Sequence, residues 1–132
     1  MQGKYAPRGN RKLGRNVAAI NRLPGETCPG ASEWCKRECY AKKGTFHFAY
    51  PHYLGEIKIP DKMPAICRIH VSGDFDTVDY VDWIHGVVAS NPGTLFWAYT
   101  RSWTIPELLP SLERLRELPN IQLFASIDES MA

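Results

Sequence analysis

The chain has 132 residues, of which 44% are hydrophobic and 23% charged, and its formal net charge at pH 7 is +2. These fractions are typical of an ordinary globular domain and exclude intrinsic disorder, while the length excludes a complete α/β barrel. With no apolar run of membrane-spanning length and no signal-peptide core after the basic N-terminus, the sequence predicts one cytoplasmic domain without a membrane partner.

The N-terminal segment is strongly basic. Its first 22 residues contain six lysines and arginines and no acidic residue. Such a segment could lie on nucleic acid or another polyanion, and a solvated leader is the alternative. We predict a basic leader over residues 1–15 and a single α/β domain over residues 16–132.

Three cysteines follow the first expected strand, an apolar run over residues 16–21. Cys28, Cys35 and Cys39 are spaced C-x6-C-x3-C, and thiolate is the ligand that iron–sulfur clusters and zinc select. If a helix begins near Cys35, a separation of four puts Cys35 and Cys39 on one face. Cys28 then returns over that face from a Pro-Gly turn. We therefore expect a metal or cluster loop.

The spacing favours a [4Fe-4S] cluster over zinc. Structural zinc usually takes two paired ligand motifs, and no second pair follows in the sequence. A Cys3His zinc site with His47 or His70 is one alternative. A disulfide between Cys28 and Cys39 is another, although a cytoplasmic protein rarely keeps one.

Strands and helices alternate over the rest of the chain. Strands are expected over residues 65–71, 94–100 and 121–127, which are short runs rich in β-branched and aromatic residues. A helix is expected over residues 78–90 with Asp76 or Thr77 as its cap. Residues 40–54 favour a helix up to Pro51. A last helix is expected to start from a capping box at Thr104 and Glu107, although Pro110 could shift that start.

This alternation predicts a parallel α/β sheet of about four strands, arranged as an open arc or half-barrel. Ligands of such sheets bind beyond the carboxyl ends of the strands. We therefore expect the cysteine loop and residues 72–74, 99–102 and 126–129 to converge on one rim.

Polar side chains mark the second strand. Alternation puts Arg68, His70 and Ser72 on one face, as the lining of a site or as a satisfied structural network. Cys67 falls on the other face near the start of the strand. We expect it to be a buried thiol rather than a fourth cluster ligand.

Charged residues at the strand ends complete the candidate site. Asp74 could bind an ammonium group or cap the following helix. Arg101 could hold a carboxylate, tune the cluster or form a surface ion pair. Asp128 and Glu129 at the last strand are similar candidates.

The layout resembles that of the radical S-adenosylmethionine enzymes, whose partial barrels hold a [4Fe-4S] cluster on three cysteines. Their Gly-Gly-Glu turn after the second strand binds the amino group of the cofactor, and Ser72, Gly73 and Asp74 occupy the matching place. The resemblance implies S-adenosylmethionine as a cofactor. Those enzymes space their cysteines C-x3-C-x2-C, whereas this chain has C-x6-C-x3-C, so the resemblance does not fix the cluster geometry or an open iron site. The fourth ligand stays open between Cys67, His70 and an external molecule.

A more specific resemblance rests on three stretches: residues 28–41 with their Cys-Tyr-Ala ending, residues 68–75 and residues 97–102. Together they resemble the phage "gene product 88" family, which implies a phage-encoded protein in the host cytoplasm. From these observations we predict an iron–sulfur protein with a small-molecule ligand or a redox partner. An electron-transfer or redox-sensing protein, or a zinc- or cluster-stabilised nucleic-acid module, is the alternative, and catalysis is left open. The predicted cofactor-binding residues are Arg68, His70, Ser72, Gly73, Asp74 and Arg101.

Overall fold

Five strands form one sheet in the computed structural model, which describes residues 1–7, 17–22, 27–38, 55–71 and 73–128. The strands lie side by side in the order in which they occur in the sequence. The last four are parallel, as predicted, and the first pairs antiparallel with the second. They are β1 (Lys4–Ala6), β2 (Val17–Asn21), β3 (Ile66–Ile69), β4 (Leu95–Thr100) and β5 (Ile121–Ala125).

Strand β1 was not predicted from the sequence. It lies within the basic leader, where Tyr5 pairs with Ile20 of β2. A strand of three residues is too short for the alternation of polar and apolar residues to be recognised in the sequence. Its pairing is decided by the neighbouring strand instead.

Helix α3 (Val78–Ala89) begins where the sequence predicted. The Thr77 side chain accepts a hydrogen bond from the Tyr80 backbone N–H at 3.1 Å, so Thr77 rather than Asp76 is the cap. The helix ends one residue before the expected Ser90, and Asn91, Pro92 and Gly93 follow it.

Helix α4 (Leu109–Arg116) begins later than predicted, so the expected capping box at Thr104 and Glu107 was wrong. Thr104 instead ends a 3-10 turn, η3 (Ser102–Thr104), and its hydroxyl donates to the carbonyl of Arg101 at 2.9 Å. Pro110 lies in the first turn of α4, where its missing N–H has no intrahelical partner to lose. The proline therefore sets the start of the helix.

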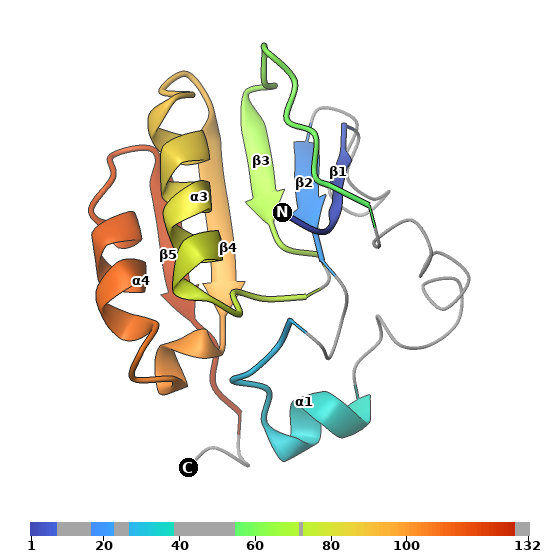
Figure 1. Cartoon of the computed structure of the whole chain (residues 1–132), viewed down its shortest axis with the longest axis vertical. Helices are drawn as coiled ribbons and strands as arrows, with labels where there is room; N and C mark the ends of the chain where they lie inside the picture. The colour runs from blue at the N-terminus through green and yellow to red at the C-terminus, as the bar shows by residue number, and fades with distance from the viewer. Residues whose placement is uncertain (8–16, 23–26, 39–54, 72, 129–132) are drawn as a thin grey trace.

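Both long helices cover the same face of the sheet. Figure 1 shows α3 and α4 in front of β4 and β5, with the opposite face of these strands turned away. This follows from the sequential strand order, because right-handed crossovers between successive neighbours all pass over one side.

The core lies between this helix layer and the sheet. Burying one of these aliphatic side chains stabilises the fold by roughly 1.5–3 kcal/mol. Helix α3 contributes Tyr80, Val81, Ile84 and Val88, and α4 contributes Leu112 and Leu115. The strand residues that meet them include Cys67, Ile69, Phe96 and Ala98, all with no exposed surface.

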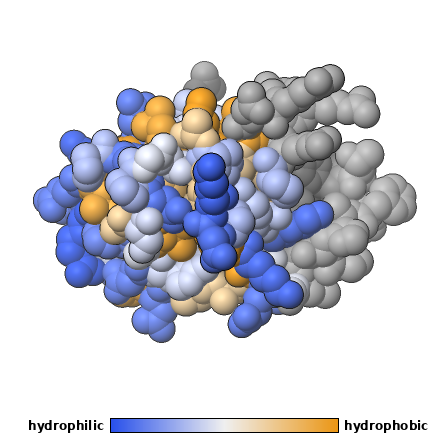
Figure 2. Space-filling model, turned by 90° about the horizontal axis from the view of Figure 1, so that it is seen from above, coloured by the Kyte–Doolittle hydropathy of each residue, from blue (hydrophilic) through white to orange (hydrophobic). Residues whose placement is uncertain are grey.

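The described residues at the amino ends of the parallel strands present a mixed surface. Figure 2 looks down on this end of the molecule and shows hydrophilic residues interspersed with small hydrophobic patches. None of the helices in the described part of the chain has the length and hydropathy needed to cross a membrane.

Candidate functional site

The carboxyl ends of the strands form the candidate site. Helix α1 (Glu33–Glu38) lies beyond the arrowheads of the parallel strands in Figure 1. Close contacts join residues 27–32 to residues 73–74, 101–102 and 128. The predicted convergence of four separate segments on one rim is therefore confirmed for these residues.

The cysteine loop reaches this rim through Cys28 and α1. Cys28 is partly exposed, and its carbonyl accepts the Ala31 N–H at 3.1 Å in a tight turn. Cys35 lies within α1, and Cys39 lies outside the described residues. The described ranges alone contain no set of three histidine, cysteine or acidic residues arranged to hold a metal ion.

The cysteine loop is held by residues that follow β4 and β5, at the carboxyl ends of these strands. A Cβ atom on Gly30 would lie 2.1 Å from the Arg101 carbonyl oxygen, so only glycine fits there. The Ser32 hydroxyl donates to the Asp128 carboxylate at 2.5 Å. Asp128 also pairs with the Arg101 guanidinium at 3.3 Å, and both side chains are mostly buried. Arg101 and Asp128 thus hold the cysteine loop in place, while Glu129 lies outside the described residues.

Asp74 follows β3 and forms hydrogen bonds with residues that lie at or after the ends of β2 and β4. Its carboxylate accepts hydrogen bonds from the Thr100 hydroxyl at 2.6 Å and from the backbone N–H groups of Phe75 and Arg101 at 2.8 and 2.9 Å. Its own N–H donates to Thr27, next to the cysteine loop. Burial raises the pKa of the Asp74 carboxyl, and these hydrogen bonds oppose that shift. Both oxygens therefore have partners within the protein.

The turn that contains Asp74 requires a glycine at position 73. Its φ is +81°, and a Cβ there would lie 2.6 Å from Arg22 and from Thr27. The predicted Gly-acid turn is therefore present at the rim. Ser72 lies outside the described residues.

Arg68 and His70 do not share a face, contrary to the prediction. Strand β3 ends at Ile69, so the alternation no longer applies at His70. Arg68 faces away from the helices, with its guanidinium 6.0 Å from the Tyr99 ring centroid. The His70 ring turns to the helix side, where Nε2 lies 2.6 Å from the Tyr80 hydroxyl and Nδ1 has no hydrogen-bond partner.

His70 belongs to a buried polar cluster that the sequence did not reveal. The Arg22 guanidinium lies 3.9 Å from the centroid of the Tyr80 ring and pairs with Asp76. Burial, followed by the charges of Arg22 and Arg68, lowers the pKa of His70 well below its usual range. Burial also raises the pKa of Tyr80, so burial favours the neutral form of both rings. The only sequence signal was a basic residue directly after a buried strand.

Cys67 lies in the core, as expected from its position in the strand. It has no exposed surface, and burial raises the pKa of its thiol to about 12. A metal ligand must be a thiolate. Its environment therefore suits a structural thiol.

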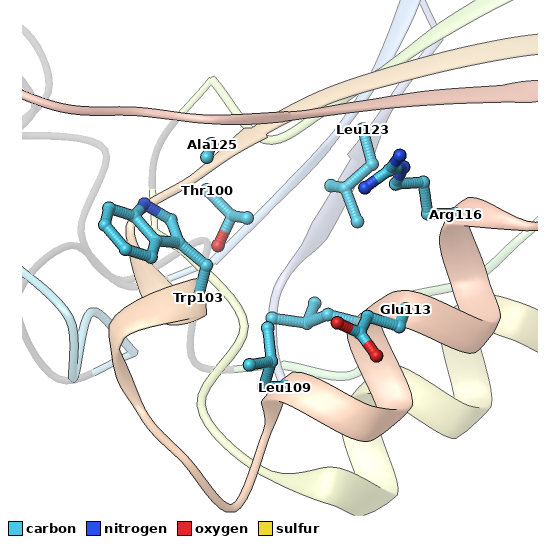
Figure 3. Close-up of a pocket in the computed structure, with 8 residues that line it drawn as sticks. Thr100, Trp103, Leu109, Glu113, Arg116, Leu123 and Ala125 are labelled. Atoms are coloured by element: carbon cyan, nitrogen blue, oxygen red, sulfur yellow. The ribbon is translucent and has the colours of Figure 1, made fainter.

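A pocket of about 230 Å³ opens on the helix side of β5. Figure 3 shows Leu109 and Trp103 on one side and Leu123 on the other, with Glu113 and Arg116 lying along α4. The Trp103 ring is held by a hydrogen bond from Nε1 to the Ser126 carbonyl at 3.0 Å. Thr100, from the predicted rim segment 99–102, lines this pocket, whereas Arg68, His70, Gly73, Asp74 and Arg101 do not.

Comparisons with known proteins agree with one of the two resemblances. The family model described as "Gene product 88" matches residues 52–132. The Gene 88 protein of Mycobacterium phage L5 is 28% identical over 148 aligned residues, which cover 91% of this chain and 60% of that protein. The chain thus spans about 60% of the length of this curated relative. The comparison with solved structures gave no match, and the radical S-adenosylmethionine-like layout stays a prediction.

Proposed function

This chain belongs to the Gene product 88 family, and from that premise we propose that it is an iron–sulfur protein of bacteriophage type whose cluster is bound by Cys28, Cys35 and Cys39. The proposed cluster is [4Fe-4S], and its place is the rim formed by the carboxyl ends of the parallel strands. The comparisons support the family and the phage relationship. The cluster is our own proposal.

One observation carries the proposal: the cysteine loop is fixed at the rim where sheets of this kind bind their ligands. Gly30 packs on Arg101, Ser32 bonds Asp128, and the Thr27 hydroxyl accepts from Asp74. These contacts come from residues after three separate strands and hold residues 27–32 at this rim. The donor chemistry fits as well, since thiolate sulfur is what iron–sulfur clusters select.

We leave the fourth iron position to a ligand from solution. Cys67 is buried in the core with a raised pKa, and the His70 ring bonds Tyr80 and packs against Phe75 with centroids 5.0 Å apart. S-adenosylmethionine or another small molecule could take that position. A bound cluster would supply one-electron chemistry, while this chain's residues hold the loop and shape the rim.

The strand order supports the proposed half-barrel. In a closed α/β barrel each strand follows its neighbour in sequence and all helices lie outside. Strands β2 to β5 follow each other in this way, with α3 and α4 on one side. We therefore propose that the sheet is a segment of such an arc, with the cysteine loop at its mouth.

The test is anaerobic iron and sulfide analysis of the purified protein, combined with electron paramagnetic resonance of the dithionite-reduced form. We expect about four irons and four sulfides per chain. Replacing Cys28, Cys35 or Cys39 by alanine should remove most of this iron. The matched control is Cys67→Ala, which changes the one cysteine that lies in the core and should keep the iron.

Four results would contradict, redirect or extend the proposal. Stoichiometric zinc in place of iron would overturn the cluster, and iron that survives a triple Cys28, Cys35 and Cys39 replacement would overturn the loop as its site. A reduced signal that shifts when S-adenosylmethionine is added would support an open iron. A signal that ignores that cofactor would favour electron transfer.

A further inference from the structure

The face of the sheet opposite the helices carries large side chains that stay exposed. Strand alternation puts Arg68, Leu95, Trp97, Tyr99, Gln122 and Phe124 on this face, which we name the open face. Leu95, Tyr99 and Phe124 are 44%, 51% and 44% exposed. Scattered exposed apolar residues are normal, whereas these side chains gather on one face, which makes it a candidate recognition surface.

Three of these side chains form a row across neighbouring strands. Tyr99 of β4 pairs in register with Phe124 of β5, and their rings stack with centroids 5.3 Å apart at an interplanar angle of 27°. The guanidinium of Arg68, on β3, lies 6.0 Å from the Tyr99 centroid. The row therefore runs from a cation through two stacked rings toward the β5 edge.

The row can be extended by another planar group. Strand β5 is the last strand of the described sheet, so no further described strand lies beside Phe124. A planar ring that stacks there would continue the Tyr99–Phe124 stack. Nucleobases are suited to this, because every base has a π-face and base–aromatic stacking tolerates any sequence.

The charge of this face suits a polyanion. None of the open-face positions in the described strands is acidic, and Arg68 makes no ion pair with any described residue. The Arg68 Nε is buried without a hydrogen-bond partner. The acids of the helix layer lie across the sheet, at Asp79, Asp82 and Glu113.

We propose that the open face binds single-stranded nucleic acid, with bases stacked on Phe124 and Tyr99 and the phosphate backbone near Arg68. This site is independent of the cysteine loop and stands whether or not that loop holds a cluster. Aromatic stacking provides sequence-tolerant affinity, and the Arg68 charge adds the salt-dependent part.

The test is fluorescence anisotropy of a labelled single strand of about 12 nucleotides, within the site sizes known for such platforms. Replacing Tyr99 or Phe124 by alanine should weaken binding by about 5-fold to 150-fold. Tyr99→Phe and Phe124→Tyr keep a ring and should bind nearly as wild type does. Leu109→Ala is the matched control, because Leu109 is 38% exposed on the helix side of the sheet.

Salt dependence separates Arg68 from the rings. Arg68→Gln should reduce the slope of log affinity against log salt by about 0.7, the value for one phosphate contact on a single strand. The alanine variants of the two rings should lower affinity and leave the slope unchanged. Circular dichroism of each variant checks that it is folded.

Several results would overturn the proposal. They are no binding at low salt, equal binding of duplex and single strand, and single-strand binding that both alanine variants retain. Sedimentation velocity gives a further check: if Tyr99→Ala and Phe124→Ala dissociate a dimer without changing nucleic-acid affinity, the open face is an interface between two copies of the chain.

Discussion

Gly30 packs against the backbone of Arg101 with no space for a side chain between them. A Cβ atom on Gly30 would lie 2.1 Å from the carbonyl oxygen and 2.5 Å from the carbonyl carbon of Arg101. Both atoms belong to the main chain, so neither can rotate away as a flexible side chain would. This contact fixes the distance between the cysteine loop and the end of β4.

Gly30→Ala should displace the cysteine loop and lower the stability of the protein. Overpacking of this kind costs about 1–3 kcal/mol, and we also expect iron content to fall. Urea unfolding and iron analysis measure the two effects. Gly86→Ala is the control, because nothing lies within 4 Å of a Cβ at that position in α3. It should stabilise the protein by about 0.5–1 kcal/mol, and equal effects of the two changes would contradict the packing argument.

Asp74→Asn should lower the free energy of unfolding by about 1–3 kcal/mol. The carboxylate accepts from Thr100, Phe75 and Arg101, and an amide group would bring its own N–H donors against these donors. Urea unfolding at neutral pH checks this. Asp79→Asn, in the exposed first turn of α3, should cost a few tenths of a kcal/mol, about the size of a helix-dipole interaction.

His70 should make the protein less stable in mild acid. Its folded-state pKa is depressed below the ordinary 6.5, mainly by burial and then by the charges of Arg22 and Arg68. Below pH 6.5 the unfolded chain therefore binds a proton that the folded chain does not. The contribution of His70 is present above that pH and is lost as pH falls, by up to about 1.4 kcal/mol per pH unit.

Urea unfolding at several pH values between about 5 and 7.5 measures this slope. His70→Gln should show a smaller loss of stability on acidification than wild type, even if it is less stable at neutral pH. Val88→Ala removes buried methyl groups from α3 without touching a titrating group, so it should be less stable with the wild-type slope. An unchanged slope in His70→Gln would show that His70 does not carry the pH dependence.

Cys67 should resist thiol reagents while the protein is folded. With its pKa raised to about 12, only about one thiol in ten thousand is ionised at pH 8, and the side chain has no exposed surface. Labelling followed by peptide mass mapping should find Cys67 unmodified until urea is added. Cys67→Ala identifies the urea-dependent signal, and rapid labelling in the native state would contradict this burial.

Local patterns were sufficient to predict the order and type of the main elements. The apolar runs at β3, β4 and β5, and the start of α3 at a cap expected from Asp76 or Thr77, are properties of neighbouring residues. Their alternation implied parallel strands, and parallel strands end at one rim. The convergence of the cysteine loop with Asp74, Arg101 and Asp128 could therefore be predicted without coordinates.

Only the tertiary structure decided how polar side chains near that rim are used. The direction of His70 depends on where β3 ends and on Tyr80 of the following helix. Arg22 meets an acidic partner 54 residues later, at Asp76, and no local pattern signals such a distance. The pairing of β1 and the stacking of Tyr99 on Phe124 likewise arise between strands. The sequence by itself determined the elements and the rim, because these follow from short-range periodicity, whereas the partners of each polar and aromatic side chain were settled by long-range packing.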